Sequence, residues 1–292
     1  MMVKNILCPI DRSPSSLQAF DYAIAIARWR EAQLILLEVI DTTVRPGAPR
    51  SAKASRVSKE TRTALETDLN RVLAARRASD VRIQIVLREG NVVKEILAQA
   101  RTSRSDLIVI GSHGSKGVQR PIGSIAERVL RVAHCPVLTV RRGVRQSHRH
   151  APPFVTILCP TDFSAAADRA LACAKRIAKL ADATLIAMNV VELPLRRPMA
   201  PRSGARITTG IGAVKEQRLA RLLARGASTN PRIQALVAIG RVGPEIVAHG
   251  LKREVDLVVM GISGRNEPGT PALGSATHHV VRKGACPVLT VR

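Results

Sequence analysis

The sequence predicts an α/β protein made of two doubly wound domains, each built on a five-stranded parallel sheet. Three observations lead to this fold class. The 292 residues contain one pattern twice, with the segments NILCPIDRS and TILCPTDFS starting 151 residues apart. The apolar runs are short and aliphatic and alternate with longer helical patterns, as in parallel sheets covered on both faces. Aromatic residues make up only 2% of the chain, which favours an aliphatic core.

The repeat also predicts the element order. In the first half, strands are expected over residues 6–9, 34–39, 83–87, 107–110 and 137–140. One helix is expected to begin near Ser13 as N-cap with Pro14 in its first position, a second to cover residues 60–76, and a third to end near Ala100. Right-handed crossovers between such strands produce a doubly wound sheet.

The same repeat predicts the domain organisation. A first domain is expected over residues 1–142, a linker over residues 143–153 and a second domain over residues 154–292. The segment around the linker, RRGVRQSHRHAPP, is polar and basic and ends in two prolines, which is typical of a connection between domains.

The net charge of +24 raises the question of polyanionic partners. Much of the basic charge lies in expected loops, over residues 45–62, 141–149 and 196–206. No zinc-finger spacing or aromatic RNA-binding signature accompanies it. The charge therefore indicates a solvated surface with salt-sensitive attraction to anions rather than a dedicated nucleic-acid site.

Cysteine usage and the N-terminal segment bear on localisation. The five cysteines contain no CxxC pair, and Cys8 and Cys159 occupy matching repeat positions, as do Cys135 and Cys286. They are expected to be small buried residues in a reducing cytosol. The N-terminus enters a strand pattern without a signal peptide, and no apolar run approaches about 18 residues. A cytoplasmic protein without a membrane partner is expected.

The loop after the fourth strand has the pattern most indicative of a ligand. In the second half it reads Gly261, two residues, Gly264, nine residues and then Gly274-Ser275. Ligands of open parallel sheets bind beyond the carboxyl ends of the strands. Glycines let backbone N–H groups approach a phosphate, and the start of a helix attracts anions. The alternative is a loop that only turns the chain, with Ser124 and Ser275 as ordinary N-caps; the duplicated spacing favours phosphate binding.

An aspartate follows the first strand of each half, on the same edge of the sheet. Asp11 and Asp162 could accept hydrogen bonds from an adenine amino group or a ribose. The alternative is a helix-capping role, because Ser13 and Ser164 follow two residues later. Residue type alone leaves both interpretations open.

These features together resemble the universal stress protein family in its tandem form, over residues 4–142 and 155–292. The resemblance rests on the strand ending in Pro-x-Asp, the Gly-x2-Gly-x9-Gly-[Ser/Thr] loop and the closing CPVLTVR strand. It implies an adenine nucleotide alpha hydrolase-like fold and ATP, alone or with Mg²⁺, as ligand. In the first half the implied site residues are Pro9, Asp11, Val39, Gly111, Gly114, Gly123 and Ser124. In the second half they are Pro160, Asp162, Val190, Gly261, Gly264, Gly274 and Ser275, with Arg265 as a neighbour that attracts phosphate.

Each copy departs from the family pattern in its own way. The first loop, SKGVQRPI, has eight residues where the pattern has nine, although its Gly-Ser-His-Gly entrance is intact. The second loop has the expected length but enters as Gly-Ile-Ser-Gly and carries Glu267, which would repel a phosphate. ATP binding is expected in at least one of the two sites.

The function expected from this pattern is ATP-dependent signalling in the stress response, through conformation or partner binding. The chain has no P-loop and no catalytic triad or paired carboxylates, so an enzyme is not expected and any ATP hydrolysis would be slow. The alternatives are a nucleotide-independent interaction module and, third, electrostatic association with nucleic acid. The family resemblance also implies that the fifth strands of the two domains pair into an intramolecular pseudo-dimer, while a homodimer and the protein partner stay open.

Overall fold

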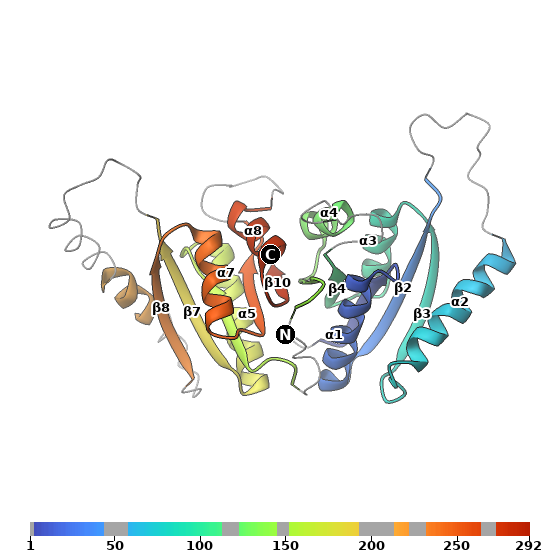
Figure 1. Cartoon of the computed structure of the whole chain (residues 1–292), viewed down its shortest axis with the longest axis horizontal. Helices are drawn as coiled ribbons and strands as arrows, with labels where there is room; N and C mark the ends of the chain where they lie inside the picture. The colour runs from blue at the N-terminus through green and yellow to red at the C-terminus, as the bar shows by residue number, and fades with distance from the viewer. Residues whose placement is uncertain are drawn as a thin grey trace. The chain divides into compact units, whose positions relative to one another are not determined.

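The computed structural model describes residues 3–43, 58–112, 123–144, 152–192, 213–221, 232–263 and 273–292. Its contacts divide the chain after Pro153 into two compact units, the N-terminal and the C-terminal domain. Each is an open sheet with helices on its faces (Figure 1). Within these described ranges, the helices are too short or too polar to cross a membrane.

The N-terminal domain contains a five-stranded parallel sheet in the order β3-β2-β1-β4-β5. Its strands are β1 (Asn5–Ile10), β2 (Gln33–Asp41), β3 (Ile83–Gly90), β4 (Leu107–Gly111) and β5 (Val137–Val140). Its helices are α1 (Pro14–Arg30), α2 (Lys59–Ala74), α3 (Val92–Thr102) and α4 (Ser124–Val132). The chain reverses direction across the sheet between β1 and β4, so the predicted doubly wound topology is confirmed.

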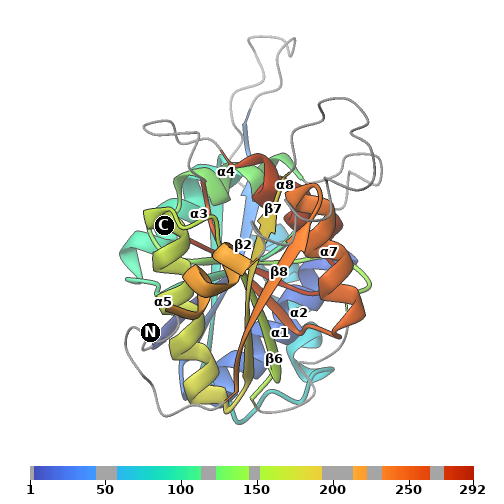
Figure 2. The same cartoon turned by 90° about the vertical axis from the view of Figure 1, so that its left-hand side faces the viewer.

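The C-terminal domain repeats this order as β10-β9-β6-β7-β8, again with parallel pairs. Its strands are β6 (Thr156–Pro160), β7 (Thr184–Val191), β8 (Ile233–Ile239), β9 (Leu257–Gly261) and β10 (Val288–Val291). Its helices are α5 (Ala165–Ala181), a helix over residues 213–221, α7 (Val242–Lys252) and α8 (Ser275–Lys283). Figure 2 shows α5 on one side of β7 and β8, and α7 on the other.

Local sequence explains where the first helix begins. Ser13 is the N-cap of α1, its hydroxyl accepts a hydrogen bond from the backbone N–H of Ser16, and Pro14 occupies the first helical position, as predicted. The strands, by contrast, extend beyond the apolar runs from which they were predicted. β2 and β3 continue to the pair Asp41–Gly90 because backbone pairing extends beyond the hydrophobic run.

The core is aliphatic, as predicted from the composition. Ile6 and Leu7 of β1 and Ile157 and Leu158 of β6 are fully buried. All five cysteines are buried and none forms a disulfide, and burial raises the pKa of the Cys135 thiol to about 11. Burial also raises the pKa of Cys8, Cys159 and Cys173, so these four thiols stay protonated near neutral pH and pack as small apolar side chains.

Candidate functional site

The carboxyl ends of β6, β7 and β9 border an open pocket of about 450 Å³ in the C-terminal domain. This volume lies within the usual range of small-molecule sites. Six residues singled out in the sequence line it. They come from the ends of three strands, the turn after β6 and the start of α8: Pro160, Asp162, Val190, Gly261, Gly274 and Ser275. Two others, Gly264 and Arg265, lie outside the described residues.

The corresponding residues of the N-terminal domain lie at the equivalent edge of its sheet. Pro9 and Val39 are near the carboxyl ends of β1 and β2, and Gly111 is the last residue of β4. Asp11 directly follows β1, while Gly123 and Ser124 open α4. Gly114 lies outside the residues that the structure describes.

The two aspartates hold the turn that follows the first strand of each domain. Asp162 Oδ1 accepts a hydrogen bond from the N–H of Ser164 at 2.9 Å, and Asp11 Oδ1 accepts one from Ser13 at 3.1 Å. The N-caps themselves are Ser13 and Ser164. The helix-capping interpretation of the aspartates is therefore wrong: they fix the loop at the sheet edge, and Asp162 also lines the pocket.

The N-cap interpretation of the two serines is also wrong. The N-caps of α4 and α8 are Gly123 and Gly274, and Ser124 and Ser275 occupy the first helical positions. A glycine has no side chain that could accept a hydrogen bond from the backbone N–H groups of the first turn, and neither helix has a side-chain cap. The positive end of α8 therefore faces the pocket without a capping side chain, an arrangement that favours an anion.

The first glycine of each loop has a structural reason that the sequence did not reveal. A Cβ added to Gly111 would lie 2.7 Å from the backbone nitrogen of Ser16 in α1. One added to Gly261 would lie 3.0 Å from the carbonyl carbon of Ala166 in α5. These glycines let the first helix of each domain pack closely against the end of the neighbouring strand. Close approach of a phosphate is therefore not needed to explain them.

The start of α7 supplies the pocket residues that sequence reasoning missed. Arg241 is the N-cap of α7 and, with Val242 and Gly243, lines the pocket. The carboxylate of Glu192, which follows β7, accepts a hydrogen bond from the N–H of Val242 at 3.2 Å. Arg241 comes two residues after the end of β8, so the rule that placed the glycine loop at the carboxyl edge could have found it too.

His279 of α8 lies against the start of α7 and also lines the pocket. A Cβ added to Gly243 would lie 2.7 Å from Cγ of His279, so the missing side chain makes room for the imidazole ring. Partial burial lowers the pKa of His279, and the nearby cations Lys283, Arg241 and Arg282 lower it further, as does His278. The ring is therefore neutral near physiological pH, beside the only basic side chain, Arg241, among the described residues that line the pocket.

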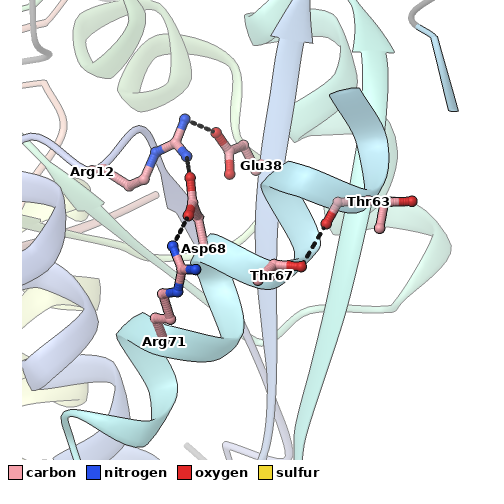
Figure 3. A network of polar contacts seen from close by, with 6 residues as sticks. All are labelled: Arg12, Glu38, Thr63, Thr67, Asp68 and Arg71. Atoms are coloured by element: carbon pink, nitrogen blue, oxygen red, sulfur yellow. Dashed lines mark hydrogen bonds and ion pairs between the residues drawn. The ribbon is translucent and has the colours of Figure 1, made fainter. Parts of the chain in front are cut away.

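In the N-terminal domain, an ion network lies beside the turn that carries Asp11. Arg12 Nη2 contacts Glu38 Oε1 of β2 at 2.8 Å, and Arg12 Nη1 contacts Asp68 Oδ2 of α2 at 3.4 Å (Figure 3). Arg71 contacts the other oxygen of Asp68 at 3.0 Å. The Glu38 residue is only 6% exposed, and its Oε2 has no hydrogen-bond partner among the described residues. Burial raises the pKa of Glu38, while Arg12 lowers it.

The C-terminal domain replaces this network by different chemistry. Phe163 stands where the first domain has Arg12, and its ring lies 5.4 Å from Lys215 Nζ and 4.2 Å from the guanidinium carbon of Arg218. Asn189 stands in the place of Glu38, and its amide donates a hydrogen bond to the carbonyl of Thr161 at 2.7 Å. The second domain therefore docks its helix over residues 213–221 by cation–π contacts.

Comparison with known proteins identifies the repeated unit. The model of the universal stress protein family matches residues 2–141 and 153–292. A universal stress protein of Methanocaldococcus jannaschii is 34% identical over 142 residues, which cover 48% of this chain and 84% of that protein.

Solved structures show the same fold over nearly the whole chain. A universal stress protein from Archaeoglobus fulgidus superposes with a TM-score of 0.67 at 21% identity, over 99% of this chain and 98% of that one. A putative universal stress protein from Pseudomonas aeruginosa gives a TM-score of 0.65 at 17% identity, over 99% and 93% of the two chains. The chain belongs to the universal stress protein family and carries two copies of the family's domain in tandem.

Proposed function

We propose that the protein binds ATP in the pocket of its C-terminal domain and acts in the stress response through nucleotide-dependent conformation or partner binding. The observation that carries this proposal is the convergence on one pocket of six residues that the glycine-loop pattern, the aspartate after the first strand and the family resemblance had singled out. They come from separate strands and from the start of α8. A loop that only turned the chain would not require an aspartate, a valine and a glycine-serine pair to face the same space.

The chemistry of the pocket suits an adenine nucleotide. Met188, Val190 and Ile246 provide an apolar wall for a flat base, and the Asp162 carboxylate can accept a hydrogen bond from an adenine amino group. The start of α8 and the guanidinium of Arg241 supply positive potential for the phosphates, which would enter alone or with Mg²⁺.

The same lining residues support binding rather than catalysis. Hydrolysis needs a base or a metal that activates water. The Asp162 carboxylate holds the turn before α5, and the Glu192 carboxylate accepts from the start of α7. We therefore propose a cytoplasmic nucleotide-binding protein that hydrolyses ATP slowly if at all, with occupancy of the pocket as the signal.

Isothermal titration of the full chain with ATP tests this proposal. Gly274→Val places a branched side chain at the N-cap of α8 and is expected to abolish saturable binding. Gly123→Val makes the equivalent change at α4 and is the matched control, expected to leave the binding at the C-terminal site. Circular dichroism confirms that both variants fold. Absence of saturable binding to the wild-type chain at millimolar ATP would overturn the proposal and favour a nucleotide-independent interaction module.

A further inference from the structure

The two domains differ in the charge of equivalent segments. The crossover between β7 and β8, residues 192–232, contains nine basic residues and two acidic ones, Glu192 and Glu216. Its counterpart in the N-terminal domain, residues 42–82, contains ten basic and four acidic residues. Since both crossovers have the same place in the fold, the difference is not explained by the architecture.

In the N-terminal domain, carboxylates neutralise the cations of α1 and α2. Arg28 pairs with Asp80, and Arg76 of the turn after α2 pairs with Asp21 of α1. Arg62 of α2 reaches Glu89 of β3 at 3.0 Å. The outer face of these two helices is therefore a mixed, self-paired surface.

In the C-terminal domain, the equivalent face has cations without such partners. Arg169, Arg176 and Lys179 of α5 are exposed, and none of them forms an ion pair within the part of the chain that the structure describes. The crossover residues outside that part, 193–212 and 222–231, contain no aspartate or glutamate. These residues therefore add arginines and no carboxylate to the charge of the crossover.

The second helix of the crossover extends the same face. Phe163 precedes Ser164, the N-cap of α5, and its contacts with Lys215 and Arg218 bring the helix over residues 213–221 beside the start of α5. Spacings of seven and three residues keep Arg169, Arg176 and Lys179 on one side of α5. They span about 15 Å at about 1.5 Å per residue, which corresponds to roughly four steps of a nucleic-acid strand.

We propose that the outer face of α5 and of the 213–221 helix, here called the α5 face, binds the phosphate backbone of a nucleic acid. Four of the seven cations in these two helices are arginines, whose planar guanidinium suits phosphate oxygens. A membrane surface is less suitable, because peripheral helices insert a continuous apolar stripe. The large apolar side chains that the described parts of these helices expose are the single residues Leu180 and Val214.

Fluorescence anisotropy of a short labelled RNA, with the full chain over a salt series, tests the proposal. The variant Arg169→Glu/Arg176→Glu/Lys179→Glu is expected to lose at least about tenfold in affinity at low salt. The slope of log affinity against log salt should become shallower by about 2, for three lost phosphate contacts on a single strand.

The control variant Arg101→Glu/Lys252→Glu/Arg253→Glu changes the net charge equally at exposed positions in α3 and at the C-terminal end of α7. It is expected to keep most of the affinity. Equal losses in the two variants would overturn the proposal, because they would indicate attraction by net charge alone. Binding of phosphatidylserine vesicles that depends on the α5 face, without binding of RNA, would also overturn it in favour of a membrane. The assay contains no ATP, so a negative result for RNA binding does not bear on the proposed ATP site.

Discussion

Single residues explain how one repeat has produced two different domains. Arg12 and Phe163 both have a positive φ, 60° and 63°, at the same point of the turn after the first strand. The turn thus presents a side chain at a fixed position, and the neighbours determine its partners. In one domain these are Glu38 and Asp68, and in the other they are cations of the 213–221 helix.

Arg12→Ala removes the cation that lies against the buried Glu38. We expect local opening of α2 and β2 to become easier by roughly 2 kcal/mol near neutral pH, because Arg12 is itself partly exposed. A carboxyl whose pKa is raised in the folded state favours that state as the pH falls, so the loss should shrink in mildly acidic buffer. Hydrogen exchange of α2 and β2 peptides, measured by mass spectrometry, gives the free energy of local opening near neutral pH and in mildly acidic buffer.

Arg71→Ala is the matched control for this network. Its side chain is 77% exposed and contacts only Asp68 of the three network partners, so the cost should stay below about 1 kcal/mol at either pH. Equal costs for Arg12→Ala and Arg71→Ala, or a cost of Arg12→Ala that does not change with pH, would contradict the role given to Glu38.

Gly243→Ala tests the contact between α7 and α8 at the pocket. The new methyl group would meet the imidazole ring of His279, so α8 must shift or the ring must leave the pocket. We expect a loss of about 1–3 kcal/mol in stability, as for other overpacked sites. The double variant Gly243→Ala/His279→Ala should recover the part of the loss that is due to the ring, while Cβ of residue 279 still lies 2.8 Å from the new methyl group. Thermal unfolding can measure this partial recovery. No recovery would show that the ring is not the obstacle.

At the scale of elements, the arrangement of α7 and α8 determines what the pocket can bind. Arg241 begins α7, Gly274 begins α8, and neither helix has a side chain of its own that caps its first turn. The ring of His279 lies between the two helices, with its pKa lowered by burial and by neighbouring cations. A phosphate in the pocket would oppose these effects and raise the pKa of that ring.

Binding of ATP should therefore take up a proton at His279. In the unliganded protein the ring loses its proton at a lower pH than usual, so binding becomes tighter as the pH falls toward about 6. One proton adds at most about tenfold in affinity per pH unit. The His279→Gln variant should lose the increase in ATP affinity that comes from the imidazole. It should keep the part of the pH dependence that comes from titration of ATP itself. Calorimetry over a pH series compares the two chains, and identical profiles would exclude His279 from the phosphate site.

The sequence located the helices and strands better than it explained the roles of single residues in them. Apolar runs located the strands, and Ser13-Pro14 located the start of α1. The ends of β2 and β3 were missed, because backbone pairing continues into polar residues such as Asp41. Gly111 was assigned to phosphate approach because its packing against α1 depends on a contact between elements distant in sequence. Arg241 was missed although it follows β8 by two residues and the same edge rule applies to it; only its place beside His279 depends on the fold.

At the scale of the whole molecule, the family match and the division into two units agree on a tandem protein. We propose domains over residues 1–142 and 154–292 with a linker over residues 143–153. The antiparallel pairing of the fifth strands into a pseudo-dimer stays a prediction from the family resemblance. A crystal structure tests it, and fifth strands that lie apart would contradict it.

The central claim is that the C-terminal pocket, lined by Asp162, Val190 and Gly274, holds an adenine nucleotide. Native mass spectrometry of the full chain with ATP tests it most directly, because each bound nucleotide adds its own mass. We predict an ATP adduct on the wild-type chain that persists in Gly123→Val and disappears in Gly274→Val. An adduct that survives Gly274→Val but is lost in Gly123→Val would contradict the assignment, and no adduct on any chain would contradict ATP binding itself.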